Sequence, residues 1–150
     1  MAKFFYPYGN AAELSGKSYT VGGGTKGIEQ PTFSGDPLFS GQYIRIGNFV
    51  HFEIEVDFSN VLTFGTGQYY LTLPFAARSE VIIRGGSLYD NSHARAFHMS
   101  GHTTPDSTEL LLYSSDKIGS SVQDVPFTFE SPVNLNNNDN FYISGSYITA

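Results

Sequence analysis

The residues with the clearest capacity for chemistry lie in the segment "NFVHFEIEVDFSN" at positions 48–60. Glu53 and Glu55 are two positions apart, so a strand would place both carboxylates on one face, about 6–7 Å apart. That separation is near the lower end for the two carboxylates of an inverting glycosidase. Catalysis needs environments that push the two pKa values apart, whereas His51 and Asp57 extend the pair into an evenly spaced polar row. We therefore predict a solvent-exposed face and no catalytic pair.

The histidines suggest a second kind of chemistry, metal binding, because His93, His98 and His102 precede Asp106 closely in the sequence. In a strand, His93 and His98 would face opposite sides because their separation is odd. The four-residue spacing from His98 to His102 suits a helix, which the sequence does not predict here. We therefore expect structural or solvent-facing histidines, with no metal and no other cofactor.

Two further features of the sequence lack the spacing that catalytic or phosphate-binding motifs require. The glycine-rich stretch "GGGTKG" at 22–27 lacks the spacing of a phosphate-binding loop and is not followed by a predicted helix. Serine is abundant, but no GxSxG nucleophile elbow occurs in the sequence. Neither motif predicts an enzyme.

The polar row at 51–57 implies a strand whose other face is buried. The alternate positions are all large and apolar: Val50, Phe52, Ile54, Val56 and Phe58. This alternation predicts that these five side chains lie in the core. The preceding "QYIRI" and the turn residues Gly47 and Asn48, which both tolerate positive φ, predict a hairpin over 42–58.

Strand patterns recur along the rest of the chain. Tyr69, Leu71 and Leu73 share one face of a predicted strand, and Gly85 with Gly86 predicts a β-bulge in "EVIIRGGSLYD". The segments "HARAFHMSGH", "TELLLYSS", "VPFTFE" and "NFYISGSYI" bring the total to about eight or nine strands. Strands at this spacing without a convincing helix predict an all-β fold, an antiparallel β-sandwich or jelly-roll.

The first part of the chain has a different character. Residues 1–36 lack sustained periodicity, so we predict an irregular, extended N-terminal arm followed by one β-sandwich domain over 37–150. The arm carries a dense aromatic cluster: Phe4, Phe5, Tyr6 and Tyr8. These side chains either cover an open end of the protein's own core or contact a neighbouring subunit or a capsid, since exposed aromatic residues are effective interface anchors.

Composition narrows the classes of partner. The 150 residues suit one domain, and the absence of cysteine excludes disulfides and thiolate chemistry. Fourteen acidic and eight basic side chains give a net charge of −6 with no basic cluster, so we expect no nucleic-acid partner. No apolar stretch is long enough for a signal peptide or a membrane span, and we expect a soluble protein made without export.

Three segments, taken in order, resemble a β-structured domain of tailed-bacteriophage virion proteins. In that group a glycine-aromatic-x-[RK]-x-Gly-Asn segment precedes a long alternating strand, an LPF segment follows, and PFTF, an Asp and a terminal SGxY strand close the domain. The resemblance spans about 110 of the 150 residues, although "SPVNLNNN" at 131–138 is longer and richer in asparagine than it leads us to expect. The matching residues are Gly41, Tyr43, Arg45, Gly47 and Asn48, then Leu73, Pro74 and Phe75, and finally Pro126, Phe127, Thr128, Phe129, Asp139, Ser144, Gly145 and Tyr147.

The resemblance implies a non-enzymatic virion structural protein. It implies a homotrimer that binds the major capsid protein or another virion protein, as a capsid decoration (cement) protein or a head fibre. It also admits a tail-fibre tip or adhesin that binds host-surface glycan, with Tyr70, Tyr89 and Tyr113 as the candidate sugar-stacking residues. Because the sequence has no repeat that could build a fibre shaft, we favour the capsid surface over the tail.

Overall fold

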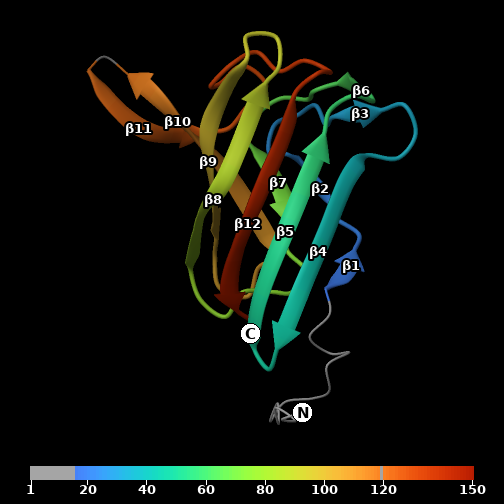
Figure 1. Ribbon diagram of the computed structural model, residues 1–150, viewed down its shortest axis with the longest axis vertical. Helices are drawn as coiled ribbons and strands as arrows, with labels where there is room; N and C mark the ends of the chain where they lie inside the picture. The colour runs from blue at the N-terminus through green and yellow to red at the C-terminus, as the bar shows by residue number, and fades with distance from the viewer. Residues whose placement is uncertain (1–15, 119) are drawn as a thin grey trace, which may run out of the picture.

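The computed structural model describes residues 16–118 and 120–150 (Figure 1). The candidate contact residues Phe4, Phe5, Tyr6 and Tyr8 lie outside this part of the chain. Within it, no helix is long and apolar enough to cross a membrane. The strands of the described part are β1 (Lys17–Tyr19), β2 (Gly23–Thr25), β3 (Thr32–Phe33), β4 (Leu38–Ile46), β5 (Phe49–Asp57), β6 (Val61–Thr63), β7 (Tyr69–Thr72), β8 (Val81–Asp90), β9 (Arg95–Thr103), β10 (Glu109–Ile118), β11 (Ser121–Pro126) and β12 (Asn140–Ile148).

The predicted all-β antiparallel class is confirmed. Ten strands form one sheet in the order β1-β4-β5-β12-β8-β9-β10-β7-β2, with β11 paired to β10, and β3 pairs with β6 in a small second sheet. The large sheet is strongly curled (Figure 1). β12, the last strand in the sequence, lies inside the sheet between β5 and β8.

The two ends of the curled sheet are joined by the short segment between β1 and β2. β1 pairs with β4 at one end, and β2 pairs with β7 at the other. The hydroxyl of Tyr19 donates a hydrogen bond to the carbonyl oxygen of Thr72 at 3.1 Å, and the Gly22 N–H donates to Oγ1 of Thr72 at 2.7 Å. We refer to residues 19–22 as the strap, because they connect opposite ends of the sheet.

These pairings correct the prediction of an irregular arm within residues 16–36. β1 and β2 fall inside the range predicted to be an irregular arm, yet both are strands of the large sheet. A boundary between residues 36 and 37 therefore does not separate them from the rest of the fold. The pattern of "KSY" and "GGT" is too short to show a period, and their conformation is set by the edges of β4 and β7.

The predicted hairpin over 42–58 is confirmed as β4 and β5, although β4 begins earlier, at Leu38. Ile46 is paired with Phe49, which leaves a two-residue turn. Gly47 has φ of 59° at the first turn position, as a type II′ turn requires. The turn is fixed from the other end of the chain, because the Thr149 N–H donates to the Asn48 carbonyl oxygen at 2.8 Å.

The core lies inside the curl. The side chains predicted to be buried on β5 and at the residue that follows it are 0–4 % exposed, so the predicted register is confirmed: Val50, Phe52, Ile54, Val56 and Phe58. The shared buried face of Tyr69, Leu71 and Leu73 is likewise confirmed. The predicted bulge is present as a register shift between Ile83 and Gly86.

Candidate functional site

In the described part of the chain, side chains fill most of the inside of the curl. Aromatic side chains fill it, including Phe58, Phe127 and Phe141, and the cavity that remains among them has a volume of about 20 Å³. A space of that size suits one water molecule, whereas small-molecule sites measure several hundred Å³. Candidate sites in the described part of the chain therefore lie on the outer face of the sheet and at its ends.

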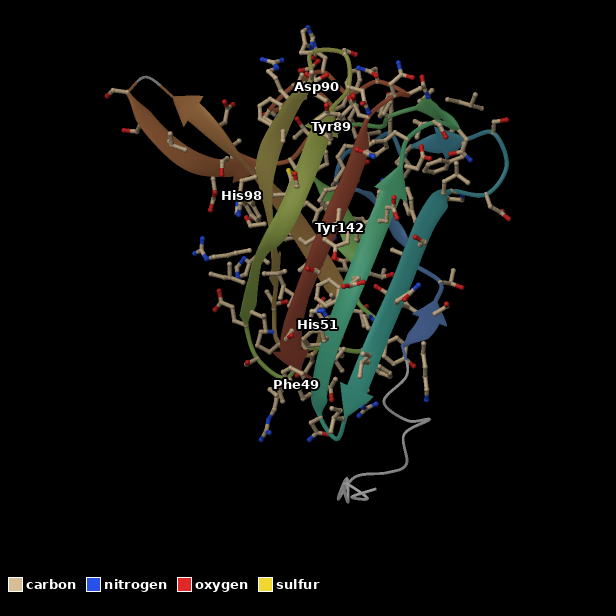
Figure 2. All side chains as sticks on the ribbon, in the orientation of Figure 1. Phe49, His51, Tyr89, Asp90, His98 and Tyr142 are labelled. Atoms are coloured by element: carbon tan, nitrogen blue, oxygen red, sulfur yellow. The ribbon has the colours of Figure 1, made fainter. Side chains whose placement is uncertain are left out.

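The carboxylate row on β5 faces outward, as predicted. Glu53, Glu55 and Asp57 are exposed, and the Glu53 side chain is 52 % exposed. Nδ1 of His51 lies 2.9 Å from the Ser146 hydroxyl on β12 (His51 is labelled in Figure 2). The two glutamates share one solvated environment, which gives no basis for distinct acid and base roles.

The histidines do not converge. His93 lies in the turn after β8 and its Nδ1 is 2.9 Å from the Asp90 carboxylate, while His102 on β9 is 2.6 Å from Glu80. His98 is exposed on β9. In the described residues no group of three or more His, Asp or Glu side chains is close enough together to hold a metal ion.

A polar cluster that the sequence did not reveal closes one end of the sheet. Asp90 is fully buried, and its carboxylate accepts hydrogen bonds from the Ser92 N–H at 3.1 Å and from Arg95 at 3.1 Å, besides the contact with His93. Burial alone would raise the pKa of Asp90. The hydrogen bonds from His93 and Arg95 together lower the pKa by more than burial raises it, so the pKa lies below its ordinary value.

Asp139, 1 % exposed, extends this cluster. Its two oxygens accept hydrogen bonds from the N–H groups of Asn91 at 3.1 Å and Asn136 at 2.9 Å. The turn after β8 is thereby held against the asparagine-rich loop before β12. Both carboxylates are occupied by internal donors, and their arrangement is that of a structural link between two loops.

The three segments that carry the phage resemblance meet at Phe75. The Phe75 ring packs edge-on against Tyr43 with ring centroids 5.1 Å apart, and the guanidinium carbon of Arg45 lies 4.5 Å from the Phe75 ring centroid. The Tyr147 hydroxyl accepts the Phe75 N–H at 3.1 Å and donates to the Phe75 carbonyl oxygen at 2.8 Å. Each of the three segments therefore contributes to one cluster of Tyr43, Arg45, Phe75 and Tyr147, which we call the Phe75 cluster.

Two other residues of these segments, Gly41 and Phe127, also pack inside the fold. A Cβ atom on Gly41 would lie 2.4 Å from side-chain atoms of both Tyr19 and Val21, so only glycine lets the strap pack on β4. Phe127 is 1 % exposed in the core. Gly41 and Phe127 thus contribute to the packing of the fold.

The outer face carries apolar and aromatic side chains in two places near the C-terminal strand. Ile46, Phe49 and Ile148 occupy one row across β4, β5 and β12 and are 38 %, 44 % and 41 % exposed. Tyr89 and Tyr142, each 41 % exposed, are diagonal neighbours on β8 and β12 (Figure 2). We call the first group the apolar row.

A separate half-buried group lies on β7, β10 and β9. Tyr70 is paired with Leu111, which in turn is paired with His102. Tyr113 is two positions from Leu111, and its ring centroid is 6.5 Å from that of His102. Of the three tyrosines predicted as sugar contacts, the structure thus brings Tyr70 and Tyr113 together, while Tyr89 lies elsewhere.

Comparisons with protein-family models, with curated proteins and with solved structures find no match for this chain.

Proposed function

We propose that this chain is a non-enzymatic structural protein of a tailed-bacteriophage virion, a capsid decoration (cement) or head-fibre protein that binds the capsid surface. The observation that supports the proposal is the Phe75 cluster. The resemblance to the phage domain rests on three segments that are far apart in the sequence. In the folded chain these segments are in direct contact through Tyr43, Phe75 and Tyr147. Such contacts are expected if the three segments belong to one inherited domain.

The proposal includes a finer description of the fold, as a β-sandwich or jelly-roll. In this description β4, β5, β12 and β8 form one layer, and β9, β10, β7 and β2 form the other. The close approach of β2 to β4, at opposite ends of the large sheet, supports this two-layer description. A Cβ atom on Gly23 of β2 would lie 3.3 Å from the Phe39 ring of β4. Residues from both layers contribute to the buried core.

The proposed partners are two further copies of the chain, in a homotrimer, and the major capsid protein or another virion protein. Phe4, Phe5, Tyr6 and Tyr8 are the proposed attachment residues, because exposed aromatic side chains contribute strongly to interfaces. The apolar row gives the described part of the chain a second surface suited to such contact.

Labelling of the protein on intact virions tests the location. We expect the label on the head, and label confined to the tail tip would contradict a decoration role. A chain lacking residues 1–15 tests the attachment segment, since all strands of the described structure begin at Lys17 or later. This variant should keep its thermal stability and lose occupancy on capsids, whereas a full-length Tyr142→Ala chain should keep both. Full occupancy of the shortened chain would exclude the segment as the attachment site.

The second candidate function is an adhesin that binds host-surface glycan. The juxtaposition of Tyr70, Tyr113 and His102 favours it, because aromatic faces next to polar groups suit sugar rings. A glycan array should then show binding that Tyr113→Ala abolishes and that Tyr89→Ala, on a different part of the sheet, leaves intact. An array without any binding would remove this candidate.

A further inference from the structure

β9 and β10 pair over only part of their length and then separate. Their register runs from Leu111 opposite His102 to Ser114 opposite Met99. Beyond that point, in the part of the chain that the structure describes, no strand pairs with the facing edges of 95–98 on β9 and 115–118 on β10. We call this opening in the sheet the fork.

The β9 side of the fork offers an open strand edge. Residues 95–98 are bound to β8 on one side, through Asp90 opposite Arg95 to Ser87 opposite His98. Arg95, Ala96 and His98 are exposed, and Figure 2 shows His98 near the point where β10 leaves the sheet. The backbone N–H and C=O groups on such an edge are a template for an additional strand.

The other side of the fork is a projecting hairpin. β11 pairs only with β10, from Pro126 opposite Tyr113 to Ser121 opposite Ile118. Figure 1 shows the two strands extending away from the curled sheet. Val122 on β11 is 74 % exposed. Because an isolated two-stranded hairpin is only marginally stable in water, this one would gain from a neighbouring strand.

Two features indicate that the fork accepts a polypeptide strand. Ser114, at the vertex, is fully buried, and its hydroxyl has no hydrogen-bond partner among the described residues. The β9 edge also carries one cation, Arg95, whose side chain is 53 % exposed and also contacts the Asp90 carboxylate, on a chain whose net charge is −6. β11 carries the opposite charge at Asp124, which is exposed. An acidic strand therefore suits the β9 edge.

We propose that the fork of one copy receives the β11 edge of the hairpin of a second copy. The hairpin edge has six residues and the β9 edge has four, so the lengths allow continuous pairing. Donor and acceptor are different surfaces of the same chain, so the contacts run head to tail, and a rotation of one third of a turn between copies would close them into the proposed trimer. The inference deepens the homotrimer of the proposed function and rests on that part of it.

Matched substitutions test the hairpin in the isolated full-length protein. Val122→Lys places a charge on the β11 edge, and Leu62→Lys, at a residue 66 % exposed on β6, is the control. Sedimentation should show that the unmodified chain self-associates, that Val122→Lys weakens the association at least tenfold, and that Leu62→Lys leaves it unchanged. An unmodified chain that stays monomeric, or a Val122→Lys chain that associates as strongly, overturns the proposal.

Disulfide trapping tests the specific pair of surfaces, since the sequence contains no cysteine. A chain with Val122→Cys is mixed with a chain with Ala96→Cys and oxidised, and the products are identified by mass. The mixed dimer should form far more readily than one between Leu62→Cys and Ala96→Cys. Equal yields would overturn the proposal. Both tests use the protein in solution, so they can fail while virion attachment, read by labelling, still holds.

Discussion

The hydroxyl of Tyr19 donates a hydrogen bond to the carbonyl oxygen of Thr72, 53 positions later in the sequence. This bond joins the β1 end of the large sheet to the β7 end, and the strap that carries it runs between the two. The curled shape is therefore held by specific polar contacts at the meeting of the ends as well as by the apolar interior.

Removal of the Tyr19 hydroxyl should weaken that closure. We expect Tyr19→Phe to lower the free energy of unfolding by about 0.5–1.5 kcal/mol, because the ring can keep its contact with Tyr43 while one hydrogen bond is lost. Urea denaturation measures the change. Tyr142→Phe, at an exposed position, is the control and should stay within about 0.5 kcal/mol of the parent. Equal effects would show that the bond does not stabilise the fold.

The two faces of β5 should respond oppositely to substitution. Phe52 is fully buried, so Phe52→Ala should cost about 3–5 kcal/mol through lost apolar contact and the cavity left behind. Glu53→Gln, on the next residue, should change stability by less than about 0.5 kcal/mol. Thermal or denaturant unfolding of the two variants compares them directly. A larger loss of stability for Glu53→Gln than for Phe52→Ala would mean that the opposite face of β5 packs against the core.

The alternation of apolar and polar residues allowed β5 to be predicted. In a half-buried strand, side chains two positions apart lie on the same face, so the alternation identifies both the buried and the exposed face. Alternation does not say which strand lies beside which. The same pattern is compatible with two stacked sheets and with one curled sheet, and the choice depends on pairings such as Lys17 with Tyr43, far apart in sequence. The fork was missed for the same reason, since it is defined by where pairing between β9 and β10 stops.

Gly41 should tolerate no side chain. A methyl group there would meet Tyr19 and Val21 at 2.4 Å, so Gly41→Ala should destabilise the protein by about 1–3 kcal/mol through overpacking. Gly16→Ala is the matched control, because the nearest atom to a Cβ atom at that position is 3.7 Å away. Chemical denaturation of both variants provides the comparison. A stable Gly41→Ala chain would show that the strap moves aside easily.

Alkaline pH should destabilise the fold. Burial raises the pKa of Tyr147 to about 12 and also raises the pKa values of Tyr19 and Tyr69, so the folded state holds these protons more tightly than the unfolded chain, whose tyrosine pKa is about 10. The corresponding stability is complete below about pH 10 and is lost as the pH rises toward 12. Unfolding free energy measured across this interval should fall. The fall should be shallower for Tyr147→Phe and unchanged for Tyr142→Phe.

The Asp90 carboxylate should stabilise the folded state more at neutral pH than at acidic pH. Because its net pKa is lowered in the folded state, its stabilising effect is present above the unfolded value of about 3.9 and is lost as the pH falls below it. Asp90→Asn should cost about 1.5–3 kcal/mol at pH 7, since charged hydrogen bonds from Arg95 and His93 are weakened. Asp57→Asn, on the exposed row, should be nearly neutral. If the two variants matched in calorimetry, the buried cluster would not stabilise the fold.

The candidate site shows a similar division between what sequence can and cannot predict. The exposure of Glu53 followed from periodicity, whereas the position of His93 in the turn after β8 was not predicted. Asp90 gave no signal, because its importance depends on donors from the turn at Ser92 and from Arg95 that only the folded chain supplies. Phe75 was noticed as part of a resemblance, whereas its contacts with Tyr43 and Tyr147 depend on tertiary structure.

The central place of β12 has a consequence for how the protein is made. β5 and β8 are separated in the sheet only by this strand, and both precede it in the sequence. During synthesis both neighbours therefore remain with an unpaired edge until residues 140–148 emerge. Open strand edges on nascent chains can associate with other chains, so the growing polypeptide is exposed to misassembly until β12 has been synthesised.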